Sequence, residues 1–202
     1  MSDSSWVYVV TDVELDGPWP GANSMRSFAS VAVSLDGTEH GRFEAVLEPL
    51  PGTAPNEHTL AFFETVPQAW AAATENPEPV TAVLNRWTTW LQALPGRRVF
   101  AAAPLSLDGP WIDYYLRRFT RYGLHPGHAE TDPLFHGAGV CITSYAAAVT
   151  GRPPVDLAIL DLPPDWFGQV AHTHHAIDDA LGYANLLVTL AGRAAQRTCD
   201  SA

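Results

Sequence analysis

One histidine and four carboxylates of this chain stand where they could meet in space. His174 lies five residues before Asp179 in AHTHHAIDDALGYANLL, at the start of an apolar segment with helical periodicity. Asp12 and Glu14 form a D-x-E at the end of the apolar stretch VYVV, and Asp108 lies midway in PLSLDGPWIDYYL. Each acid falls at the end of an expected strand or the start of an expected helix. Together they form the set that a two-metal phosphodiesterase needs.

The carboxylates suit hard divalent cations. Mg²⁺ and Mn²⁺ prefer oxygen ligands, and two ions ~4 Å apart stabilise the attacking and leaving oxygens of a phosphodiester displacement. We expect two Mg²⁺ or Mn²⁺ ions, with Asp12 bridging them and Glu14 and Asp179 completing the ligand set. Asp108 would approach from the far side, directly or through water. Histidine titrates near neutral pH, so His174 suits the role of general base for the attacking water.

Each of these residues also has an ordinary structural explanation. A D-x-E at a strand end is usually a solvated loop, and Asp108 could cap the helix that follows it. Asp178 and Asp179 could complement a helix dipole, and the histidines of HTHH could be exposed loop residues. These explanations do not account for all the acids falling at strand ends and helix starts in this order. We therefore favour a shared site.

A zinc site is the alternative that the histidines leave open. It would use His172 and His174 with Cys141, and His174 and Asp178 would share a helical face if the helix began early enough. No third distant histidine completes a zinc set, and we expect Cys141 in the core. The alternative function is thus a zinc-dependent hydrolase. The chain has no G-x-x-x-x-G-K, G-x-G-x-x-G or G-x-S-x-G motif, so neither a phosphate-binding glycine loop nor a serine hydrolase is supported.

The charge balance argues against a protein that binds nucleic acid through a basic surface. The chain of 202 residues has a formal net charge of −11, and its 11 basic residues are all arginine. Bound divalent cations would cancel part of the negative charge where it is densest. The negative net charge therefore does not by itself exclude a nucleic-acid substrate.

Several features bear on location and assembly. No apolar run is long enough for a membrane-spanning helix, so we expect no membrane partner. The N-terminus MSDSSWVYVV lacks the basic region of a signal peptide, and two cysteines form no disulfide framework, so we expect a cytoplasmic protein. Trp6, Trp70 and Trp166 look exposed, which makes a homodimer plausible.

Hydrophobic patterning predicts the elements that must position the site. Expected strands cover residues 6–12, 25–35, 39–47 and 98–103, with a hairpin turn at Asp36-Gly37. Expected helices cover residues 58–64, 80–94, a segment from near Asp108, 143–150 and about 175–195. This order predicts one α/β domain with a mixed sheet, helices on both faces and the first strand at its centre. Asp12 and Glu14, two positions apart, would then lie on one side of that strand.

Four segments resemble the DEDDh exonucleases, a superfamily that includes ribonuclease T, oligoribonuclease and the proofreading subunit of bacterial DNA polymerase III. The segments are TDVELDGPWPG, SMRSFASVAV, LSLDGPWIDYYL and HTHHAIDDAL, and the resemblance spans nearly the whole chain. It implies an α/β, ribonuclease H-like fold with a mixed five-stranded sheet flanked by helices. It also implies a single exonuclease domain over residues 1–202.

The resemblance assigns a role to each motif residue. Asp12 and Glu14 match the metal ligands of the first motif, and Asp108 matches the aspartate of the second. His174 matches the general base and Asp179 the last ligand of the family's H-x-x-x-x-D. The last motif is the most specific, the first comes next, and the second is loose.

The sequence departs from the family at a few neighbouring positions. Ala103 and Pro104 stand where the second motif often carries a histidine and an asparagine, and Leu15 stands where many members have threonine. These residues are not metal ligands, so the departures concern substrate contacts. By the resemblance, His175 would be an ordinary exposed residue and Asp178 would not bind metal.

The activity implied is a 3′–5′ exonuclease that releases nucleoside 5′-monophosphates from single-stranded RNA or DNA. Leu15, Trp19, Phe62 and Phe63 are the expected substrate-binding residues, since bases stack on aromatic rings without strong sequence preference. Core packing competes with that role for at least one phenylalanine. A catalytically inactive nucleic-acid-binding module of the same fold is the remaining alternative.

Overall fold

A five-stranded mixed sheet forms the centre of the computed structural model, which describes residues 6–125 and 131–200. The first five residues, which entered the expectation about a signal peptide, lie outside the described residues. The strands are β1 (Trp6–Leu15), β2 (Met25–Val33), β3 (Glu39–Val46), β4 (Arg97–Ala102) and β5 (Val140–Cys141). Their order is β3-β2-β1-β4-β5, with β1 antiparallel to β2 and parallel to β4. The predicted mixed sheet with a central first strand is confirmed.

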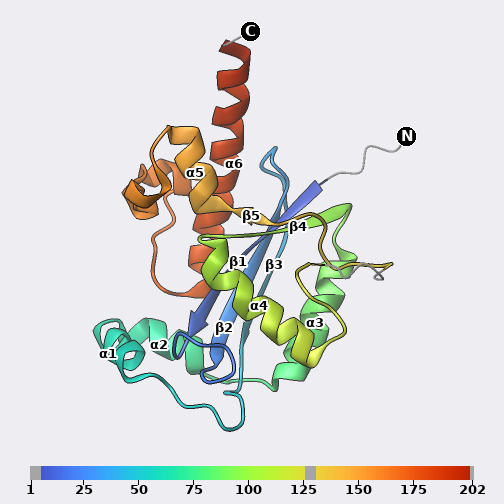
Figure 1. The fold of residues 1–202 in the computed structure, drawn as a ribbon, viewed down its shortest axis with the longest axis vertical. Coiled ribbons are helices and arrows are strands. Elements are labelled where there is room, and N and C mark those ends of the chain that lie inside the picture. The colour runs from blue at the N-terminus through green and yellow to red at the C-terminus, as the bar shows by residue number, and fades with distance from the viewer. Residues whose placement is uncertain (1–5, 126–130, 201–202) are drawn as a thin grey trace.

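Six α-helices and three short 3₁₀-helices pack around this sheet in the described part of the chain (Figure 1). The α-helices are α1 (Glu57–Thr65), α2 (Pro67–Thr74), α3 (Val80–Ala93), α4 (Leu105–Phe119), α5 (Ile142–Thr150) and α6 (Ala176–Asp200). The 3₁₀-helices are η1 (Pro154–Asp156), η2 (Ile159–Asp161) and η3 (Pro164–Phe167). None of the described helices is long and apolar enough to cross a membrane.

Each face of the sheet carries its own hydrophobic core. Val7 and Val9 of β1 pack with Trp87 of α3 in one core, and Val10 packs with Leu187 of α6 in the other. Side chains alternate between the two faces of a strand, so a strand covered on both faces needs apolar residues at nearly every position. This requirement explains the unbroken run VYVV in β1.

Three differences from the prediction concern the surroundings of the site. β1 continues to Leu15 because its pairing with β2 extends that far, so the D-x-E lies within the strand. Helix α2 was not predicted, and it begins at Pro67, a residue well suited to the first helical turn. β5 has only two residues, too few to leave a recognisable pattern in the sequence.

Candidate active site

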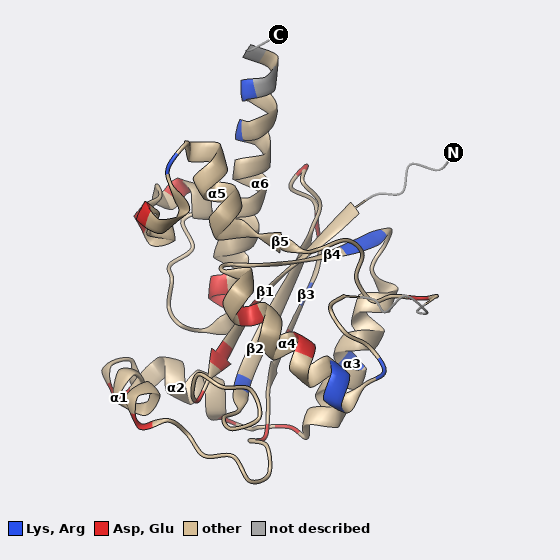
Figure 2. Cartoon of the chain, viewed as in Figure 1, with Lys and Arg blue, Asp and Glu red and all other residues tan. Residues whose placement is uncertain are grey.

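A cavity of about 300 Å³ opens where β1, α1, α4 and the start of α6 meet. Its lining consists of Asp12, Val13, Glu14, Leu15, Thr59, Phe62, Phe63, Ala103, Leu107, Asp108, His172, His174, Asp179 and Tyr183. Figure 2 shows acidic segments of β1, α4 and α6 gathered on this side of the molecule. All four carboxylates that the sequence singled out therefore share one cavity with His174.

Three of the acids lie close enough to share a cation. Single carboxylate oxygens of Asp12, Glu14 and Asp179 all lie within 4.8 Å of one another. Asp12 and Glu14 alternate with Val13 along β1, so both project to the face that carries Val10 and the α6 core. Asp179 reaches them from the first turn of α6.

Asp108 completes the group from the opposite side. It lies in the first turn of α4 and is only 2% exposed, and its Oδ2 has no hydrogen-bond partner among the described residues. The N-cap of α4 is Pro104, so Asp108 is not the helix cap that its position in the sequence allowed. A buried carboxylate oxygen without a partner is costly, and it marks a place where a ligand could be bound.

No arginine lines this cavity to balance the acids, and the chain has no lysine. Burial, together with the charges of neighbouring acids, raises the pKa of Asp12 well above its ordinary value and that of Glu14 to about 8. Burial likewise raises the pKa of Asp108 to about 8, although backbone hydrogen bonds oppose the shift. The fully ionised cluster is therefore unfavourable by itself, and bound cations would stabilise it.

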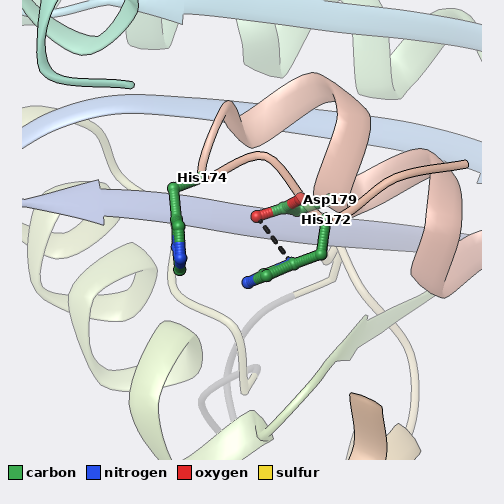
Figure 3. A group of neighbouring side chains, drawn as sticks. All are labelled: His172, His174 and Asp179. Carbon is green, nitrogen blue, oxygen red and sulfur yellow. Dashed lines mark ion pairs between the residues drawn. The ribbon is translucent and has the colours of Figure 1, made fainter. Parts of the chain in front are cut away.

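Asp179 is held in place by the segment that precedes α6. Its Oδ2 lies 2.9 Å from His172 Nδ1, and its Oδ1 accepts a hydrogen bond of 3.0 Å from the backbone N–H of Thr173. Figure 3 shows His172, His174 and Asp179 converging, with the ion pair between His172 and Asp179 dashed. The carboxylate is thereby oriented before any ligand enters.

His174 is fixed by an unusual backbone conformation and by two rings. Its φ of +56° lies in the left-handed region, which costs a residue other than glycine on the order of 1 kcal/mol or more. Its ring centroid lies 4.4 Å from that of His172 and 5.1 Å from that of Phe62, both in edge-to-face contact. Burial, followed by the neighbouring His172, lowers the pKa of His174, which keeps its imidazole neutral and able to accept a proton.

The predicted substrate-binding residues divide into two groups. Leu15, Phe62 and Phe63 line the cavity, but Trp19 does not, and its side chain is 70% exposed. Phe63 is buried and its ring packs against Trp70 at a centroid distance of 4.8 Å, as a core residue would. Phe62, which is 45% exposed, is the aromatic ring most accessible to a base.

The surroundings of the predicted zinc site differ from the expectation. His172, His174 and Asp179 offer three donor atoms within 4.8 Å of one another, whereas Cys141 belongs to neither donor group found among the described residues. Helix α6 begins at Ala176, after His174, so His174 and Asp178 do not share a helical face. The HTHH pattern singled out His172, but nothing in the sequence indicated that His172 pairs with Asp179.

His175 is not the ordinary exposed residue that the resemblance implied. Its Nε2 lies 2.7 Å from Glu44 Oε1 of β3, and its side chain is partly covered. Asp178 accepts a hydrogen bond of 2.8 Å from the Thr173 hydroxyl. The ion pair of His175 with Glu44 connects the start of α6 to the edge of the sheet, which no local pattern could reveal.

No protein-family model and no curated protein matches this chain. Solved structures, in contrast, do match this chain. The nuclease domain of 3′hExo, a DEDDh family member, bound to rAMP, matches with a TM-score of 0.64 at 10% identity over 97% of this chain and 94% of that one. Exonuclease I of E. coli with a dT13 oligonucleotide matches with a TM-score of 0.66 at 14% identity, over 96% of this chain but 43% of that one.

These matches extend over nearly the whole chain, and at such identities they show the fold. The chain has the α/β, ribonuclease H-like fold of the DEDDh 3′–5′ exonucleases, with a five-stranded mixed sheet and flanking helices. The predicted fold class is confirmed.

Proposed function

We propose that residues 1–202 form a single domain that acts as a metal-dependent 3′–5′ exonuclease on single-stranded RNA or DNA. The fold is that of DEDDh exonucleases, and two matching structures carry rAMP and a dT13 oligonucleotide. The observation that carries the proposal is the cavity with four carboxylates and no arginine in its lining. Such a cluster costs stability and is retained at sites where it has a chemical use.

The donor set fits two Mg²⁺ or Mn²⁺ ions. Asp12, Glu14 and Asp179 supply grouped oxygens, and Asp108 supplies a buried oxygen without a partner. When bound, such ions stabilise charge on the attacking and leaving oxygens of a phosphodiester displacement. In this proposal Asp12, Glu14 and Asp179 would hold the ions, and Asp108 would contribute directly or through water.

His174 is the proposed general base. Its neutral imidazole would take a proton from the attacking water while the water oxygen forms a bond to the terminal phosphorus. The P–O3′ bond breaks, the 3′ oxygen takes a proton from the solvent and leaves as a hydroxyl, and the product is a nucleoside 5′-monophosphate. Phe62 and His172, which touch the His174 ring on two sides, would limit its rotation during this step.

Side chains at the rim of the cavity would bind the terminal nucleotides. Phe62 and Leu107 are both about half exposed and line the same cavity as the carboxylates, together with Leu15. Exposed apolar side chains beside an acidic site can stack on bases while bound cations counter the phosphates. Binding of this kind does not need a basic surface, which reconciles the proposal with the net charge of −11.

Digestion of RNA and DNA oligomers labelled at the 5′ or the 3′ end tests the proposal. With Mn²⁺, we expect a ladder that shortens from the 3′ end and releases 5′-monophosphates, and EDTA stops the reaction. Asp12→Asn, which removes one charge at nearly constant shape, serves as the matched inactive control. Release of nucleotides from the 5′ end, or equal release by Asp12→Asn, would contradict the proposal.

A zinc-dependent hydrolase is a second candidate because His172, His174 and Asp179 cluster. It predicts hydrolysis with Zn²⁺ alone that survives Asp12→Asn. An inactive binding module of the same fold predicts that Mn²⁺ does not bind, and calorimetry with Mn²⁺ distinguishes that case.

We also propose a cytoplasmic protein that can form a homodimer. Trp6 is partly exposed at the start of β1, as the dimer requires, whereas Trp166 is covered by Arg193, whose guanidinium lies 3.9 Å from the ring centroid. Sedimentation of the purified protein at micromolar concentration determines whether a dimer forms.

A further inference from the structure

We propose that His172, His174 and Asp179 form an inhibitory Zn²⁺ site, which shares only Asp179 with the four-carboxylate cluster. One nitrogen from each histidine and one oxygen of Asp179 lie within 4.8 Å of one another. Two imidazoles and one carboxylate are typical Zn²⁺ ligands, whereas Mg²⁺ and Mn²⁺ favour sets made of oxygen. The cavity thus offers one oxygen-rich donor set and one nitrogen-rich donor set.

Small movements would bring the three donors to a metal. Donors of a tetrahedral zinc ion with bonds of about 2.0–2.1 Å lie roughly 3.3 Å apart. His172 Nδ1 and Asp179 Oδ2 are already 2.9 Å apart, and the His172 side chain is 28% exposed. The His174 ring centroid lies 4.4 Å from that of His172, and Figure 3 shows both rings beside the Asp179 carboxylate.

The surroundings support a metal ligand at Asp179. Its second oxygen accepts a hydrogen bond from the Thr173 N–H, and contacts of this kind orient ligands in metal sites. The left-handed backbone at His174 turns the chain so that two histidines only two residues apart face one carboxylate. The fourth position would be open to the cavity, where water could fill it.

Inhibition follows from the shared residues, and this half of the inference rests on the proposed function. Asp179 belongs to both donor groups, so Zn²⁺ bound by the two histidines would withdraw it from Asp12 and Glu14. The same ion would occupy the nitrogen of His174 that the proposed mechanism needs for proton transfer. Zn²⁺ and Mn²⁺ would therefore each weaken the binding of the other.

Calorimetric titration of the metal-free protein with Zn²⁺ tests the site without any assay of activity. We expect one Zn²⁺ per chain. His172→Gln removes one donor and should weaken binding by at least about 100-fold, since even changes around the ligands cost 10–100-fold in affinity. His175→Gln is the matched control, because that histidine pairs with Glu44 outside the cluster and should leave Zn²⁺ affinity unchanged.

Asp12→Asn separates the two donor sets. It should retain Zn²⁺ binding, since Asp12 is not among the three donors, while Mn²⁺ binding falls. Equal Zn²⁺ affinity in the wild-type protein and His172→Gln would overturn the proposed site, whatever the activity of the protein.

A second measurement compares nucleotide release in Mn²⁺ with and without Zn²⁺. We expect added Zn²⁺ to lower the rate of the wild-type protein at least about tenfold, and the ratio of the two rates to approach one in His172→Gln. Release supported by Zn²⁺ alone would refute an inhibitory role and favour the zinc hydrolase. Absence of release in Mn²⁺ would contradict the proposed function, while the calorimetric result would still decide the zinc site.

Discussion

Carboxylates in the acidic cavity and carboxylates on the outer surface near β3 and α3 have pKa values that are shifted in opposite directions. On the surface, Arg42 donates two hydrogen bonds of 2.8 Å to Glu39. Arg86 likewise donates bonds of 2.7 and 2.8 Å to Glu78. These hydrogen bonds lower the pKa of both glutamates, whereas burial and like charges raise the pKa of Glu14 in the cavity to about 8.

The difference separates carboxylates that are paired with an arginine from carboxylates that have no arginine beside them. Asp16 is a useful comparison, because it lies only two residues beyond Glu14 and is fully buried. Its Oδ1 accepts a hydrogen bond of 2.6 Å from the Ser24 N–H, and its Oδ2 lies 3.7 Å from Arg26 Nη1. Burial raises the pKa of Asp16, but the contacts with Ser24 and Arg26 oppose that rise. A buried acid of this chain can therefore be given partners, and those of the cavity have no arginine within its lining.

The largest expected effect comes from removing a carboxylate of the cavity. Asp12→Asn should lower nucleotide release at least about 10⁴-fold, since the loss of bound cations forfeits several kcal/mol and each 1.4 kcal/mol is a factor of ten. The circular dichroism spectrum should stay unchanged, because the substitution preserves shape. Near-normal release with Mn²⁺ would show that the cavity acids are not metal ligands.

Loss of the proposed base should have the next largest effect. His174→Ala should reduce kcat by about 10²–10⁴-fold, the usual worth of a positioned general base. Added imidazole should restore part of the rate if the role is proton transfer. His175→Ala provides the comparison, and an equal loss in both variants would assign the effect to the structure of the segment rather than to a base.

The stability of the metal-free protein should depend on pH through Glu14. Its pKa is about 8 in the fold against an ordinary value of 4.5, so the folded state holds the proton more tightly. The contribution of protonated Glu14 to the stability of the folded state is fully present below about pH 4.5 and is lost as the pH rises through about 8. We expect Glu14→Gln to raise stability at pH 8.5 by several kcal/mol, because each pKa unit between the folded and unfolded states is worth about 1.4 kcal/mol, and to change it little at pH 4.5.

Urea unfolding at both pH values, in EDTA and in Mg²⁺, measures this effect. Mg²⁺ should raise the stability of the wild-type protein at pH 8.5 but not that of Glu14→Gln to the same extent. A wild-type stability that does not fall between the two pH values would show that the cluster is already neutralised within the protein.

Loss of a stacking contact with the substrate should have a smaller effect on nucleotide release. Phe62→Ala should lower kcat/KM by about 5- to 100-fold, because stacking on one base is worth about 1–3 kcal/mol. Trp19→Ala should change it little, since that side chain does not line the cavity. A larger loss in Trp19→Ala than in Phe62→Ala would indicate that the nucleic-acid substrate lies over the loop after β1.

The smallest effect is expected from removing an ion pair on the surface. Glu78→Gln breaks the exposed pair with Arg86 and should cost less than about 1 kcal/mol in urea unfolding, with nucleotide release unchanged. A loss comparable to that of a cavity variant would remove the distinction between the two regions.

The sequence alone determined the fold class and the elements that carry the site. The apolar run in β1, the hairpin around Asp36-Gly37 and the helical pattern after His174 are local features, and each is typical of one kind of element. The spacing of D-x-E and H-x-x-x-x-D likewise lies within short segments. Such features need no knowledge of distant contacts.

Only the tertiary structure decided how those segments meet. It brought His172 to Asp179 and His175 to Glu44, and among the described residues it placed neither Trp19 nor Cys141 in the cavity lining. It also buried one oxygen of Asp108 without a hydrogen bond from any described residue. These outcomes depend on strand register, on the turn at His174 and on the packing of α4 against β1. The free energy of a buried charge depends on every neighbour within a few ångströms, and most of those neighbours are far away in the sequence.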